Sequence, residues 1–318
     1  MNNSYISKLN EVFFQEMPAI SIAWVRLVLY SSLVYLLLSR DFRVFAFAPD
    51  VVLNFYPSQQ YKPASGYAAL GCPTLVDLST FHWVHWIFSI PNSDTLFLIQ
   101  SIAILFCVLV LVLGRGPKNL FVIGAYIFIS YLYGYVWRSG GDIESIFLML
   151  QVALAFCFFR ESEALIPRAS MEVFEYSHSN GAQYSIVLLI FCSYYFYSGL
   201  NKLWDISPFG WFQYDLVQTI GNFKDMSDLG FYFAQAPLTS WLRDWTLLNY
   251  IGVPLVYIAE ITCPIIFLYR KLIPYYVAFF ALFHYLVWGV AVCFFGVLLM
   301  LSALLPIHRF SKVRGEHS

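Results

Sequence analysis

The sequence predicts an all-α, polytopic transmembrane bundle of about eight spans. Of its 318 residues, 60% are hydrophobic and only 12% are charged, whereas soluble domains carry about 25% charge. Apolar runs long enough to cross a bilayer recur along the chain, at about 1.5 Å per helical residue. Lipid must therefore surround much of the surface. The net charge of −1 argues against nucleic acid as a partner, since that would require a basic patch.

Seven apolar runs predict the individual helices. In chain order they are 19–38, 95–113, 119–137, 142–159, 183–200, 248–268 and 272–306. The last run is too long for one crossing and is interrupted by Gly289 and Gly296. It therefore predicts a tight hairpin of two short spans, which brings the total to eight.

The even number of spans places both termini on the same side. The short connections 114–118 and 269–271 carry Lys and Arg, and short positively charged loops stay in the cytoplasm. We expect residues 1–18 to form a cytoplasmic segment, 19–306 the transmembrane domain and 307–318 a cytoplasmic tail. The predicted location is the plasma or inner membrane.

The long connections 39–94 and 201–247 then face outward. Within them, residues 81–88 and 209–220 place aromatic side chains beside polar ones at helical spacing. This pattern predicts helices that lie in the membrane interface. The six cysteines include no CxxC pair, so the sequence predicts no metal site.

Charged residues inside spans are candidates for function, because they are costly in lipid. Arg26 and Glu260 fall at similar depths in the cytoplasmic half of their spans. We expect them to form a structural ion pair that fixes helix register.

The outer half holds a second set of polar residues. Lys202 ends the span 183–200, Asp142 and Glu144 begin the span 142–159, and His284 lies in a late span. These groups could converge as an acid–base site if burial held the lysine neutral. A structural interpretation stays open: Asp142 as a helix N-cap, Lys202 as the partner of a helix C-terminus, and His284 as a helix-to-helix hydrogen bond.

The stretch 195–203, YFYSGLNKL, is followed by Trp204, Asp205 and Gly210. It resembles the HTTM domain, the horizontally transferred transmembrane domain of the vitamin K-dependent γ-glutamyl carboxylases. Phe283-His284 followed by the aromatic-glycine stretch 294–296, and the polar turn 137–142, are similar to other parts of that family.

The resemblance implies a carboxylase-like membrane enzyme acting on the extracytoplasmic side. In that family a lysine is the base toward vitamin K hydroquinone, whose oxygenation yields a stronger base. That base removes a glutamate γ-proton, and CO₂ traps the carbanion. Carried over, the resemblance implies a reduced isoprenoid quinone, O₂ and CO₂ as cofactors. Lys202 and His284 are the implied catalytic residues, and Asn201, Asp142, Glu144, Trp204 and Asp205 the candidate supporting residues.

The sequence also departs from the carboxylase pattern. Carboxylases carry two consecutive lysines where this chain has Asn201-Lys202, an asparagine-histidine pair where it has Gly141-Asp142, and a large extracytoplasmic region where it has a short tail. We therefore expect it not to carboxylate clotting-type precursors.

Two alternatives stay open. One is a membrane factor for maturation or export of a secreted peptide toxin, similar to the sporulation-delaying protein B type. Such a factor would act on a peptide or work with a separate extracytoplasmic partner protein. The other is a non-catalytic membrane assembly or quinone-binding subunit.

Overall fold

The computed structural model describes residues 7, 10–47, 92–113, 118–138, 144–159, 176–213, 248–290 and 295–305. These residues are mostly helical, as the sequence predicts. They belong to two compact units. The first holds the described residues up to Ile190 and those from Ala303 onward, and the second runs from Phe191 to Ser302.

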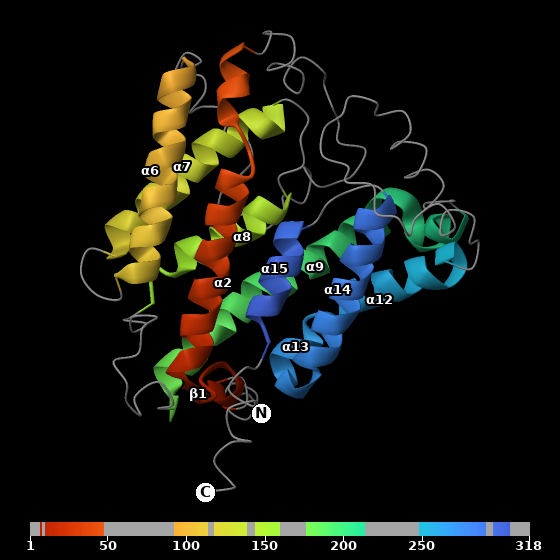
Figure 1. Ribbon diagram of the computed structural model, residues 1–318. Helices are drawn as coiled ribbons and strands as arrows, with labels where there is room; N and C mark the ends of the chain where they lie inside the picture. The colour runs from red at the N-terminus through yellow and green to blue at the C-terminus, as the bar shows by residue number, and fades with distance from the viewer. Residues whose placement is uncertain are drawn as a thin grey trace, which may run out of the picture. The chain divides into compact units, whose positions relative to one another are not determined.

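The first unit is a group of packed helices (Figure 1). Its elements are α2 (Ala19–Leu38), the short 3-10 helix η1 (Phe42–Phe47), α6 (Ser93–Val112), α7 (Lys118–Arg138) and α8 (Glu144–Ala155). Helix α6 packs against α7 and α2, and α8 also packs against α7 and α2. Two short strands, β1 (Met17–Pro18) and β2 (Tyr176–Ser177), pair antiparallel before α2 and α9.

Helix α6 shows why lipid is the expected surroundings of this unit. Its buried residues Leu96, Gln100, Ala103, Cys107 and Val110 follow the alternating spacing of four and three that defines one helix face. The opposite face is exposed yet equally apolar, with residues such as Leu98, Leu105 and Val112. A helix that is apolar all round belongs in a core or in a membrane, and this one has an open face.

In the described part of the chain, α2 and α6 are long and apolar enough to cross a membrane. The prediction of a helix over 19–38 is confirmed by α2, and α6 and α7 lie close to their predicted limits. Helix α8 is shorter than the predicted span 142–159, because the chain turns after Ala155. The total of about eight crossings remains a prediction.

The second unit contains helices from the C-terminal half of the chain. They are α9 (His178–Gln213, whose first residues belong to the first unit), the π-helix η4 (Leu248–Gly252), α12 (Val253–Thr262), α13 (Ile265–Leu268), η5 (Arg270–Leu272), α14 (Ile273–Val290) and α15 (Phe295–Ala303, whose last residue belongs to the first unit). Within this unit α12 packs against α14.

Two predicted limits in this half were wrong. The span 183–200 was expected to end at Leu200, but α9 continues to Gln213 and takes in the first residues of the interfacial helix expected at 209–220. The single span 248–268 is divided between α12 and α13 at Pro264, because proline lacks the amide donor that a continuous helix needs.

The run 272–306 contains two helices, α14 and α15, as its length predicts. The prediction of an interfacial helix at 81–88 lies outside the described residues, as does the rest of 209–220.

Candidate functional site

The second unit contains a buried hydrogen bond between a tyrosine and a histidine. The hydroxyl of Tyr195 on α9 and Nε2 of His284 on α14 lie 2.7 Å apart, and the direction of the bond depends on the histidine tautomer. The two residues are 1% and 4% exposed. The Tyr195 ring stacks on Phe280 with centroids 3.8 Å apart. Phe280 precedes His284 by one helical turn, so one helix face holds both ends of the tyrosine.

A second polar contact lies next to the first along α9. Ser198 Oγ donates to Oε1 of Glu260 on α12, at 3.3 Å, and Glu260 is 2% exposed. Nearer the start of α9, the Cys192 thiol donates to the carbonyl of Cys263 at 3.6 Å. Helix α9 thus directs a thiol, a phenol and a hydroxyl toward different partners within two turns.

Gly199 allows α9 to approach α12 closely. A Cβ atom at this position would lie 3.0 Å from Cγ1 of Ile261 and 3.1 Å from Cβ of Glu260. Small residues permit such close helix packing in membranes. The glycine of the sequence motif therefore has a packing role, and it helps bring Ser198 to Glu260.

Lys202 lies inside α9, and the structural alternative that placed it at a helix C-terminus is wrong. The helix continues to Gln213, about three turns farther. Lys202 follows Ser198 by four residues and Tyr195 by seven, so its position shares their face of the helix, about 6 and 10.5 Å along the axis. The side chains of 201–213 are not among those described.

The other predicted site residues are placed only in part. Asn201, Trp204 and Asp205 lie on α9 beside Lys202, and Glu144 begins α8. Asp142 lies outside the described residues.

The predicted ion pair joins residues of two different units. Arg26 is fully buried in the first unit and Glu260 is buried in the second. Their pairing stays a prediction. Among the described residues, no three His, Cys, Asp or Glu side chains gather as a metal site would require.

Sequence reasoning gave no role to Tyr195 or Ser198, although both lie in the motif it singled out. The signal was present in their spacing. Polar side chains at 195, 198 and 202 recur at three and four residues, which places them on one face of an α-helix.

Comparison of the chain with models of known families, with curated proteins and with solved structures finds no match. The resemblance to the HTTM family rests on the motifs described above. The chemistry of the site indicates what it can do. A phenol and an imidazole joined by a direct hydrogen bond can pass a proton between them, and here the pair is surrounded by apolar and aromatic side chains.

Proposed function

We propose that this chain is a multi-pass membrane protein whose second unit contains an acid–base site for a lipid-soluble substrate. The observation that carries the proposal is the buried hydrogen bond between Tyr195 and His284, with Lys202 two helical turns farther on the same face of α9. Ionisable groups inside apolar helices are costly and tend to be kept for function. The exposed apolar face of α6 supports the membrane setting.

The proposed reaction is carboxylase-like and proceeds on the extracytoplasmic side. Lys202 is the proposed base that takes the proton of a quinol hydroxyl, and the Tyr195–His284 pair is proposed to orient that hydroxyl. A phenol and an imidazole suit a quinol, because both groups can donate or accept a hydrogen bond at its oxygens. A reduced isoprenoid quinone would supply the weakly acidic hydroxyl and the electrons that reduce O₂. The strong base so formed would remove a proton from a C–H group of a peptide or small lipid-accessible substrate, and CO₂ would add to the resulting carbanion.

The test is quinol-dependent O₂ uptake by the purified protein in lipid nanodiscs. Lys202→Met should lower the rate by about 10²-fold or more, the range for loss of a general base. Lys271→Met, which changes an exposed lysine of η5 in the same way, should leave the rate unchanged. Equal rates for wild type and Lys202→Met would eliminate the lysine as the base.

The same experiment separates the alternatives. A wild-type protein that binds the quinol with no O₂ uptake would favour a quinone-binding or assembly subunit. Failure to bind the quinol, with co-purification of a small secreted precursor or an extracytoplasmic protein, would favour the peptide-maturation factor.

A further inference from the structure

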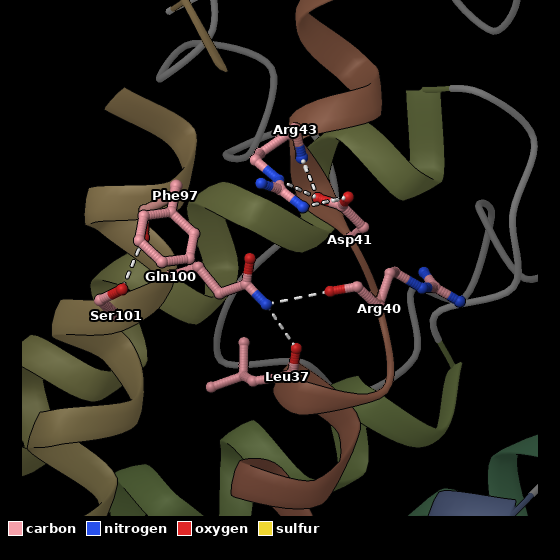
Figure 2. Close-up of polar contacts among 7 residues, drawn as sticks. All are labelled: Leu37, Arg40, Asp41, Arg43, Phe97, Gln100 and Ser101. Atoms are coloured by element: carbon pink, nitrogen blue, oxygen red, sulfur yellow. Dashed lines mark hydrogen bonds and ion pairs between the residues drawn. The ribbon is translucent and has the colours of Figure 1, made fainter. Parts of the chain in front are cut away.

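A polar cluster lies at the end of helix α2 and is shown in Figure 2. Gln100 of α6 donates from Nε2 to the carbonyls of Leu37 (2.6 Å) and Arg40 (2.9 Å). The last carbonyls of a helix lack partners within it, so Gln100 closes this end of α2 and fixes the chain that follows.

The residues after α2 form a charged pair held against aromatic rings. Asp41 accepts from Nε and Nη2 of Arg43 at 2.8 Å each, and the Arg43 guanidinium lies 5.7 Å from the centre of the Phe97 ring. The guanidinium of Arg40 lies 5.3 Å from the centre of the Tyr133 ring. Three charged groups are thereby collected at one end of the first unit.

The short helix η1 has one buried ring and an open apolar surface. Phe42 is fully buried and packs edge-on against Tyr133, with centroids 5.3 Å apart. Val44 and Phe47 are 53% and 80% exposed, and Leu38 at the end of α2 is 67% exposed. These apolar side chains lie within a few residues of the Asp41–Arg43 pair.

We propose that residues 38–47 form an interfacial anchor that seats the end of α2 in the headgroup layer of a phospholipid bilayer. Leu38, Val44 and Phe47 enter the upper acyl layer, and the charged groups of Asp41 and Arg43 stay among the phosphates and amines of the headgroups. The occupant is lipid because exposed apolar side chains of the adjoining helices flank this segment: Tyr35 of α2 precedes Leu38 by one turn, and the exposed Phe97 of α6 lies against the Arg43 guanidinium. Mixed aromatic and basic residues also suit this boundary.

This anchor rests on the membrane setting of the proposed function and is independent of its chemistry. It gives η1 a definite depth. If η1 lay outside the bilayer, water would surround Phe47. If the charged pair were absent, nothing would hold η1 at the headgroups, and Phe47 would lie deeper among the acyl chains.

Photocrosslinking in phospholipid nanodiscs tests the depth. Phe47→p-benzoylphenylalanine should yield phospholipid adducts at the glycerol or the first acyl carbons, located by tandem mass spectrometry. Leu105→p-benzoylphenylalanine is the matched reference, because Leu105 is exposed in the middle of α6 and should give adducts far along the acyl chain. In the Phe47 variant, replacing the charges by Asp41→Leu and Arg43→Leu should shift the adducts toward the chain ends.

Each other outcome overturns something specific. Lipid adducts at Leu105 with none at Phe47, or with Phe47 crosslinked to protein, would overturn the anchor and leave the membrane setting intact. Chain-end adducts at Phe47 in the otherwise unchanged protein, or no shift after removal of the charges, would overturn the headgroup depth. No phospholipid adduct at either position would overturn the membrane setting and the anchor with it. The substituted residues lie in the first unit, so these variants should leave quinol-dependent O₂ uptake unchanged, and that assay tests the chemistry separately.

Discussion

Removal of the Tyr195 hydroxyl should cost stability only when His284 is present to use it. Tyr195→Phe keeps the ring that stacks on Phe280 at 3.8 Å and deletes the oxygen that lies 2.7 Å from His284 Nε2. Hydrogen bonds between membrane helices average about 0.6 kcal/mol and reach about 1.7 kcal/mol. This bond is short and both residues are almost fully buried, so we expect a coupling energy near the upper end, about 1.5 kcal/mol.

The assay is a double-mutant cycle on the free energy of unfolding, measured by titration with SDS from a mild detergent. It combines Tyr195→Phe, His284→Leu and the double variant. Tyr184→Phe is the matched control, since it deletes another buried hydroxyl of α9 whose partner is the carbonyl of Leu304 at 2.9 Å. The control should cost about 1 kcal/mol alone and show no coupling to His284→Leu. A coupling for Tyr195 below about 0.3 kcal/mol, the usual error of additivity, would refute the idea that the pair acts as a unit.

Three further outcomes follow from the described contacts. Gln100→Leu should lower the free energy of unfolding by about 2 kcal/mol, because the buried carbonyl of Leu37 and the part-buried carbonyl of Arg40 lose their donor. Ser101→Ala on the next residue is the control, and equal effects would contradict the role of Gln100. Gly199→Leu should lower the free energy of unfolding by about 1–3 kcal/mol, because the larger side chain overpacks against α12. Gly199→Ala should lower it less, because alanine favours the helix. Unchanged SDS unfolding of the leucine variant would contradict the close packing of α9 on α12 at this position. The hydrogen bonds from Arg43 lower the pKa of Asp41 below its ordinary value, so this exposed pair adds a small stability above about pH 4 that is lost as the pH falls further. Asp41→Asn should remove that loss below about pH 4 in thermal melts, and a pH dependence identical to wild type would count against it.

Hydropathy predicted the helices well where the chain is uniformly apolar. Helix α2 begins and ends where its apolar run does. It starts directly after Pro18, and at its other end the polar residues Ser39 and Arg40 coincide with the end of the helix. It failed at α9, where Asn201 and Lys202 were taken as the end of the helix. Hydropathy reports where apolar surroundings end, whereas a helix continues for as long as its backbone hydrogen bonds do. Pro264 interrupts a run that is apolar on both sides. Hydropathy therefore does not predict this break in the helix, and the only signal for it is that proline lacks a backbone N–H donor.

The candidate site was predictable on one side of the contact and hidden on the other. His284 drew attention because an imidazole inside an apolar helix is rare, while Tyr195 is one of 23 tyrosines and nothing in its own chemistry sets it apart. Only its spacing from Ser198 and Lys202 reports that the three share a face. The partners Glu260 and His284 lie on helices far along the chain, and their approach depends on packing details such as Gly199 against Ile261. A single sequence shows which residues of one helix share a face, but it does not show which helices contact each other. The residues that one helix contributes to such a site can therefore be predicted from sequence, whereas their partners on other helices require coordinates.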